Sequence, residues 1–221
     1  TNGKIDVAAI AKVINAEKPD LVALQEIDVH TPRSGKDLDQ AKELGRLTGM
    51  HAFFSKGIDL GGGEYGVAVL SRYPLEETFR MDLPVVPDSK GEPRTLAAVK
   101  VRISKKQVLI FASTHLDLKE VNRINQTKQI IERFKEEKLP VILAGDFNTL
   151  PNSGEMKMLD QYFTRTCLEN CGGTFPVVNP DREIDYIMYR PAHKLKVISH
   201  KVIDEQFASD HLPVVAEIEV K

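Results

Sequence analysis

Apolar residues follow a helical spacing at the start of the chain and a continuous run directly after it. Ile5, Ala8, Ala11 and Ile14 predict an amphipathic helix over residues 5–17 that ends before Pro19. The unbroken apolar run at residues 21–24 is typical of a strand covered on both faces, and it leads into Gln25 and Glu26. Buried strands do not normally finish in a carboxylate, so Glu26 is a candidate for function.

The middle of the chain is rich in strand patterns. Residues 37–48 predict a second helix, and strands are expected at 51–55, 66–71, 76–83, 95–103 and 107–115. Ser104-Lys105-Lys106 joins the last two segments as a hairpin turn does. This pattern indicates an antiparallel meander within a chain that also contains helices.

The second half predicts a long helix at 119–137, a doubly buried strand at 140–145 and a short helix at 154–161. A Gly-, Pro- and Asn-rich loop at 171–182 is expected on the surface, followed by strands at 184–189, 195–203 and 214–220. Mixed strand order with helices at both ends indicates an α/β (α+β) fold in which two packed sheets lie between helical layers.

Length and composition limit the class of protein. A chain of 221 residues, 42% of them hydrophobic, predicts a single domain over 1–221, and we expect a monomer. A net charge of −2 makes long nucleic acid a less favoured partner. No apolar stretch has the ~20 residues of a membrane helix, so we expect a soluble chain, either secreted or periplasmic after loss of a signal, or cytoplasmic. Cys167 and Cys171 are read as two free thiols or one local disulfide.

Polar and ionisable residues recur where predicted strands end. Each alone has an ordinary explanation, because an Asp after a strand is most often a turn or N-cap residue. Together they indicate a site, since ligands of α/β proteins collect at strand ends. Oxygen donors suit Mg²⁺ or Mn²⁺, and phosphate hydrolysis uses a cation, a carboxylate for water and a His–Asp pair. The residues concerned are Glu26, His115, Asp117, Asp146, Asn148, Asp185, Asp210 and His211.

Five ordered motifs make the interpretation specific. They are Leu24-Gln25-Glu26, the segment Gly66 to Ser71, Thr114-His115-Leu116-Asp117, Gly145-Asp146-Phe147-Asn148 and Ser209-Asp210-His211. In this order they resemble the endonuclease/exonuclease/phosphatase superfamily of metal-dependent hydrolases. The resemblance covers nearly the whole chain and implies a four-layer α/β/β/α sandwich of two mixed, largely antiparallel sheets.

The resemblance also implies roles for individual residues. Glu26 would ligate the metal, with Asp210 as a second or water-mediated partner. Asp146 would position or deprotonate the attacking water. His211 would face the phosphate and be oriented by Asp185, or this pair would act as general base.

Four further assignments concern the phosphate. Asn148 matches an amide that donates to a phosphate oxygen, and His115 matches a phosphate donor or leaving-group acid. Arg94 has the geometry to bind an oxyanion, although a solvated loop arginine is an equally good interpretation. Tyr65 is assigned to substrate contact, against the more ordinary reading of a partly buried aromatic at a strand start.

The chain departs from the family pattern at its beginning. Members start with a central strand that carries a metal-binding Asn, whereas this sequence opens with Thr1-Asn2-Gly3. Asn2 lies in a polar segment typical of a turn, so we expect this central strand to be missing. Substrate choice is expected to depend on the loops at 60–64 and 171–182.

The leading hypothesis is a Mg²⁺-dependent phosphoesterase, with Mn²⁺ as an alternative metal, that acts on a small or lipid-linked phosphodiester or phosphomonoester. A nuclease is the nearest alternative, using local cations such as Lys105, Lys106 and Arg123. A non-catalytic phosphate-binding module ranks third, because a module without turnover is expected to lose Asp146, Asp185 or His211.

Overall fold

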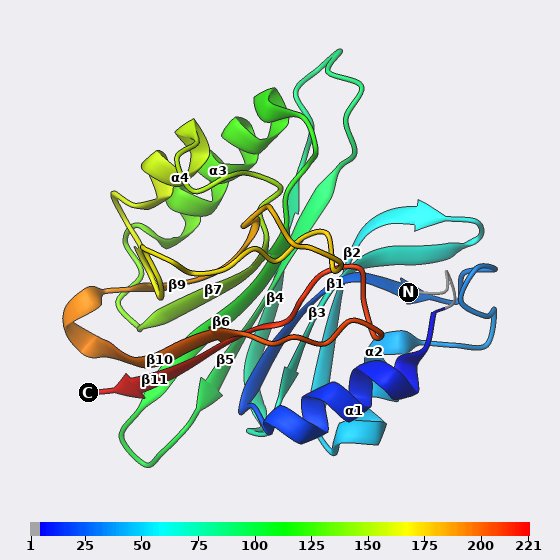
Figure 1. The fold of residues 1–221 in the computed structure, drawn as a ribbon, viewed down its shortest axis with the longest axis horizontal. Helices are drawn as coiled ribbons and strands as arrows, with labels where there is room; N and C mark the ends of the chain where they lie inside the picture. The colour runs from blue at the N-terminus through cyan, green and yellow to red at the C-terminus, as the bar shows by residue number, and fades with distance from the viewer. Residues whose placement is uncertain (1–4) are drawn as a thin grey trace.

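Residues 5–221 form four layers in the computed structural model, which describes this part of the chain; Asn2 lies outside it (Figure 1). One sheet has the order β1-β3-β2, with β1 at Leu21–Val29, β2 at His51–Leu60 and β3 at Gly63–Ser71. Both of its strand pairs are antiparallel. Helices α1 (Val7–Glu17) and α2 (Gln40–Thr48) lie on its outer side.

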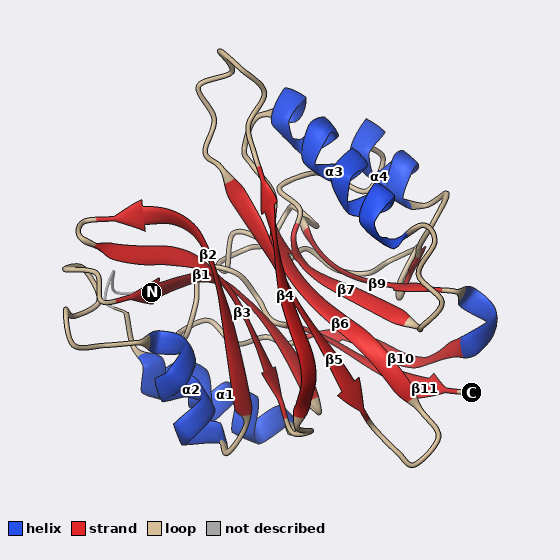
Figure 2. Ribbon diagram, turned by 180° about the vertical axis from the view of Figure 1, so that it is seen from behind, coloured by secondary structure: helices blue, strands red, loops and turns tan. Residues whose placement is uncertain are grey.

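The larger sheet has six strands in the order β4-β5-β6-β7-β9-β8. The β6–β7 pair is parallel and the other pairs are antiparallel. Helices α3 (Glu120–Phe134) and α4 (Gly154–Leu159) cover its outer face (Figure 2). Its strands are β4 (Leu75–Leu83), β5 (Arg94–Arg102), β6 (Val108–His115), β7 (Val141–Asp146), β8 (Thr164–Arg165) and β9 (Asp185–Arg190).

Three buried clusters hold the layers together. The first lies between α3, α4 and the six-stranded sheet and contains Ile130, Phe134 and Leu143. The second lies between the sheets, where Val69 and Phe111 are among its members, and the third joins α1 and α2 to the small sheet. Burial of apolar surface in three successive interfaces accounts for the predicted α/β/β/α order.

A two-stranded ribbon completes the sheet structure. Strands β10 (Leu195–Val202) and β11 (Val214–Val220) pair antiparallel with each other, and the short helix η1 (Ala192–Lys194) precedes them. Within residues 5–221, β1 pairs only with β3 and β11 only with β10. The expected mixed and largely antiparallel character is confirmed, while the second sheet layer consists of a three-stranded sheet and a separate ribbon.

Local sequence chemistry explains the helix ends. The carboxylate of Asp6 accepts from the Ala9 N–H at 3.0 Å and starts α1, and Lys18 ends it in the left-handed region with φ 52° before Pro19. Asp39 caps α2 by accepting from the Lys42 N–H. The helix predicted from residue 37 therefore begins at Gln40, because Asp39 takes the N-cap position.

Two predicted segments differ in the structure. Strand β1 does not stop at Leu24 but passes through a bulge and continues to Val29. Strands β2 and β3 extend toward each other and meet at Gly61 and Gly62, which both have positive φ. The expected glycine-rich loop at 60–64 is thus a tight hairpin turn.

The two cysteines, for which two alternatives were open, form a disulfide with a Cα–Cα distance of 5.7 Å. In residues 5–221 no helix has the length and apolar character needed to cross a membrane.

Candidate active site

Three candidate residues lie in one row across neighbouring strands. His115 ends β6, Asp146 ends β7 and Asp185 begins β9. The strand register pairs His115 with Asp146 and Asp146 with Asp185. Residues paired in this way point to the same face of a sheet with Cβ atoms roughly 5 Å apart. Residues separated by 70 positions of sequence are therefore neighbours at one sheet edge.

A fourth residue reaches this row from the loop before β11. His211 Nδ1 lies 2.8 Å from Asp185 Oδ2 and donates to it, which leaves Nε2 free to face a ligand. Phe175, in the loop before β9, packs on the imidazole with ring centroids 4.6 Å apart. Burial alone would lower the pKa of His211, but the hydrogen bond and charge of Asp185 outweigh it and raise this pKa to about 9.

Asp146 is almost fully buried, with 6% of its surface exposed. Burial raises its pKa to about 7, and the charge of Asp185 adds to this effect. The His211 cation and the Asn148 N–H, which donates to Asp146 Oδ1 at 2.7 Å, partly oppose it. The carboxyl group of Asp146 is therefore poised to exchange a proton near neutral pH.

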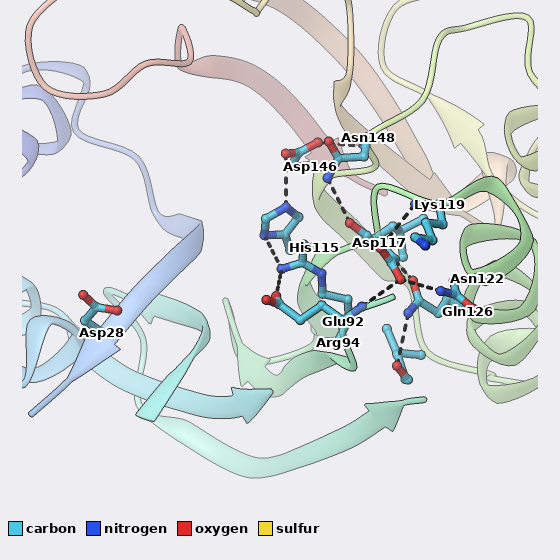
Figure 3. Close-up of polar contacts among 12 residues, drawn as sticks. Asp28, Glu92, Arg94, His115, Asp117, Lys119, Asn122, Gln126, Asp146 and Asn148 are labelled. Atoms are coloured by element: carbon cyan, nitrogen blue, oxygen red, sulfur yellow. Dashed lines mark hydrogen bonds and ion pairs between the residues drawn. The ribbon is translucent and has the colours of Figure 1, made fainter. Parts of the chain in front are cut away.

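A chain of polar contacts continues from Asp146 through His115 to Arg94 (Figure 3). His115 Nε2 lies 3.3 Å from Asp146 Oδ2, and His115 Nδ1 lies 3.4 Å from an Arg94 nitrogen. Burial, with the charges of Arg94 and His211, lowers the pKa of His115 well below its ordinary value. The imidazole is neutral, and because Arg94 donates to Nδ1, its proton is on Nε2.

Arg94 is itself buried, and its guanidinium forms an ion pair with Glu92 at 2.6 Å. Its Nε has no hydrogen-bond partner among residues 5–221. Arg94, His115 and Tyr65 line a cavity of about 10 Å³, which has room for one water molecule. Arg94 and Tyr65 thus lie next to the row, and Arg94 is buried at the start of β5 rather than solvated in a loop.

Asn148 ties two site loops together. Its φ is 49°, and its side-chain amide donates to the Leu116 carbonyl at 2.9 Å. One amide hydrogen is engaged in this bond, so the other is available to a phosphate oxygen.

The two expected metal ligands occupy more open positions. Glu26 lies in the β1 bulge with φ 56° and is exposed, and Asp210 is exposed in the loop before β11. Their negative charges act on residues of the site. The charge of Glu26 raises the pKa of Asp146, and the charge of Asp210 raises the pKa of His211. Bulges of this kind redirect a side chain out of the regular strand alternation.

The donor set fits a divalent cation. Ligand atoms of Asp146, Asp185 and His211 lie within 4.8 Å of one another. Among residues 5–221, these are the three His, Cys, Asp or Glu side chains that lie close enough together to hold one metal ion. The carboxylate charges of Asp185 and Glu26 destabilise ionised Asp146, and a cation would relieve this repulsion. Hard oxygen donors are the ligands of Mg²⁺ and Mn²⁺.

Sequence reasoning missed several residues around the site. Glu92 pairs with Arg94, and Phe175 supports His211. Asp117, grouped with the candidates, instead accepts hydrogen bonds from Glu92 N–H and the Asn122 amide. It anchors the loop at 84–93, a role that depends on contacts between segments distant in sequence.

Comparison with known proteins decides the family. Residues 2–211 match the Endonuclease/Exonuclease/phosphatase family. The chain belongs to this family. Its members are hydrolases that act on phosphate esters, and the family is generally metal-dependent.

A curated relative of this endonuclease/exonuclease/phosphatase protein is YbhP of Escherichia coli strain K12, which carries the description "uncharacterized". The two are 31% identical over 163 residues, which is 71% of this chain and 63% of YbhP. The chain thus matches somewhat less than two thirds of the length of that relative.

Solved structures share the fold. An endonuclease/exonuclease/phosphatase from Beutenbergia cavernae has a TM-score of 0.80 at 25% identity, covering 97% of this chain and 66% of the other. The mannosyl-6-phosphatase Bt3783 of Bacteroides thetaiotaomicron has 0.76 at 20%, covering 96% and 90%. D. rerio TDP2, solved with a single-strand DNA product, has 0.71 at 18%, covering 97% and 92%.

Proposed function

We propose that the chain is a Mg²⁺-dependent phosphoesterase whose catalytic centre is the row His115, Asp146 and Asp185 together with His211. The observation that supports this most strongly is the register that joins these residues at one sheet edge. A carboxyl group with a pKa near 7 beside an imidazole with a pKa near 9 supplies a base and a cation at neutral pH.

In this proposal Asp146 accepts a proton from the attacking water. The water oxygen forms a bond to phosphorus as the ester P–O bond opposite it breaks, and the leaving oxygen takes up a proton from solvent. The protonated His211 stabilises negative charge on the phosphoryl oxygens, and Asp185 holds its ring in place. Neutral His115 suits the role of phosphate donor through Nε2–H better than that of leaving-group acid.

Glu26 and Asp210 would hold the cation, with oxygens of Asp146 and Asp185 close to the same charge. When bound, the cation neutralises charge on the phosphoryl oxygens. Arg94 would contribute to phosphate binding through its unpaired Nε, and Tyr65 would form the adjoining wall. Asn148 would donate its second amide hydrogen to the same phosphate.

The test is Mg²⁺-dependent hydrolysis of an aryl phosphodiester and an aryl phosphomonoester. We expect Asp146→Asn and His211→Gln each to lower kcat by about 100- to 10,000-fold, the range for general acid–base groups. His193→Gln is the matched control, because His193 is exposed in η1, away from the row. Equal turnover in all four proteins would refute the proposal.

The likeness in fold to a mannosyl-6-phosphatase is compatible with a small substrate for this chain. The likeness in fold to TDP2 is compatible with a nucleic-acid substrate. The near-neutral charge balance favours the small or lipid-linked phosphoester. Binding of phosphate without turnover in the parent protein would instead support the non-catalytic module.

A further inference from the structure

A buried ion pair joins α3 to α4 beside the candidate site. Arg123 Nε on α3 lies 2.7 Å from a carboxylate oxygen of Glu155 on α4, and the two helices lie side by side (Figure 2). The side chain of Glu155 is 1% exposed and that of Arg123 is 13% exposed. The guanidinium of Arg123 is therefore turned inward and is not the exposed cation that a nuclease surface would use.

The same guanidinium holds the chain segment that follows His115. Arg123 Nη1 donates to the Leu118 carbonyl at 2.6 Å and to the Asp117 carbonyl at 3.3 Å. Both carbonyls lie just after the end of β6, which is His115. Because a guanidinium presents its N–H groups in a rigid plane, one side chain fixes this segment relative to α4.

Asn148 joins the same two parts of the chain at a second point. Its amide donates to the Leu116 carbonyl at 2.9 Å, and the chain after Asn148 leads into α4. The N-cap residue Ser153 fixes the start of that helix and with it the position of Glu155. The two chain segments are therefore connected twice, by the Asn148 amide and by the Arg123 guanidinium.

The buried pair supplies geometry more than stability. Removing two charges from water costs about as much free energy as their attraction provides, and apolar residues of similar volume often stabilise a protein equally well. An arginine adds donors in fixed directions, and those of Arg123 fall on the carbonyls that follow Leu116. Leu116 is in turn the acceptor that orients the Asn148 amide.

From these contacts we infer that Arg123 is a positioning residue that acts through Asn148. Its hydrogen bonds to the segment after His115 hold the Leu116 carbonyl in place. That carbonyl binds one hydrogen of the Asn148 amide, so the second hydrogen is directed toward the phosphate. The inference rests on the proposed function, in which Asn148 binds the phosphate, and it extends that function to a residue outside the row.

The experiment measures how inorganic phosphate inhibits Mg²⁺-dependent hydrolysis of whichever aryl phosphoester the parent turns over. In the double variant Arg123→Met/Glu155→Leu, apolar side chains replace the ion pair, so no unpaired charge is buried and the fold is retained. We expect the inhibition constant for phosphate to rise about tenfold, since a misdirected amide loses one hydrogen bond to phosphate. We expect kcat to change less than about twofold, because that bond serves the bound substrate and the transition state alike.

Two further variants separate the geometry of the pair from its charge. Arg123→Lys keeps a cation opposite Glu155 but has a single nitrogen, so the inhibition constant should rise less, by about threefold. The matched control is Arg165→Met/Asp160→Leu. Arg165 is 12% exposed and pairs at 2.8 Å with Asp160 at the C-terminal end of α4, and its loss should leave phosphate inhibition unchanged.

Asn148→Ala distinguishes positioning from a general structural role. In that background the Arg123→Met/Glu155→Leu change should have no further effect on phosphate inhibition, because its effect passes through the missing amide. A parent without aryl phosphoester turnover would refute the proposed function. With turnover present, an unchanged inhibition constant in the double variant, or an equal rise with and without Asn148, would overturn the inference alone.

Discussion

Asp146 is a buried carboxyl group beside the charges of Asp185 and Glu26, and its ionisation opposes folding. Its pKa in the folded protein, about 7, lies above the ordinary value of 3.8. The stability that Asp146 contributes is therefore complete below about pH 4 and is lost as the pH rises through about 7. Catalysis at neutral pH uses the ionised form of Asp146, which is the form that destabilises the fold.

Replacing this carboxyl group is expected to stabilise the protein while removing activity. In EDTA, Asp146→Asn should raise the free energy of unfolding by about 2 kcal/mol at about pH 8 relative to the parent, with a smaller gain at about pH 5. Urea titrations at the two pH values measure this difference. A gain that does not change with pH would contradict the assignment of the raised pKa to Asp146.

The raised pKa of His211 depends on its hydrogen bond to Asp185 and on the charge of that carboxylate. In Asp185→Asn the hydrogen-bonded charge is gone while the burial remains, so the pKa of His211 should fall from about 9 toward or below 6.5. Imidazole NMR titration measures it. Asp210→Asn is the control, because Asp210 is the weakest of the contributors that raise this pKa. A pKa that stays near 9 in Asp185→Asn would show that other groups hold the proton.

At the scale of elements, α3 anchors the loop that presents Glu92 and Arg94. Asn122 on α3 is fully buried; its amide donates to Asp117 and its carbonyl oxygen accepts from the Val86 N–H. One amide side chain thus satisfies both the loop backbone and a buried carboxylate. The loop projects from the sheet in Figure 1 between β4 and β5, and this contact limits its movement.

Removal of this anchor should affect both stability and substrate binding. We expect Asn122→Ala to lower the free energy of unfolding by about 2 kcal/mol, since it leaves buried polar groups without partners. KM for the aryl diester should rise more than kcat falls, because Arg94 is displaced and Asp146 is not. Asn125→Ala is the control on the same helix, where Asn125 makes one exposed bond of 3.4 Å to Pro84. Equal KM in the two variants would contradict this role.

The elements that periodicity identifies are those with a strong local signal. The continuous runs of β1 and β7 and the end of α1 before Pro19 were readable, because burial and helix termination act over a few residues. The continuation of β1 past Glu26 was not, since a bulge is stabilised by pairing with β3. The two-residue strand β8 exists only through its pairing with β9.

At the scale of the whole molecule, the family and layer order followed from motifs in sequence, whereas the contacts of the site did not. The row of His115, Asp146 and Asp185 follows from strand order, and local patterns do not encode which strands are neighbours. The Arg94–Glu92 pair and the support of His211 by Phe175 are likewise long-range outcomes of packing.

Metal binding is expected to stabilise the whole chain. The melting temperature of the parent should rise with Mg²⁺ concentration by mass action, because the folded state alone brings the carboxylates together. Glu26→Gln should lose most of this rise, while Glu217→Gln, a change at an exposed position of β11, should keep it. A full rise of the melting temperature with Mg²⁺ in Glu26→Gln would contradict the role of Glu26 as a metal ligand. The metal would then be assigned to Asp146, Asp185 and His211.

The shared register of His115, Asp146 and Asp185 has a practical meaning for engineering. Because hydrogen-bonded alignment of β6, β7 and β9 sets their spacing, a library that varies only the connecting loops leaves these three groups in place. A one-residue slip of β7 would send Asp146 into the hydrophobic interior and an apolar side chain into its position. Selection for new substrates can therefore proceed on the loops, while strand alignment preserves the reaction.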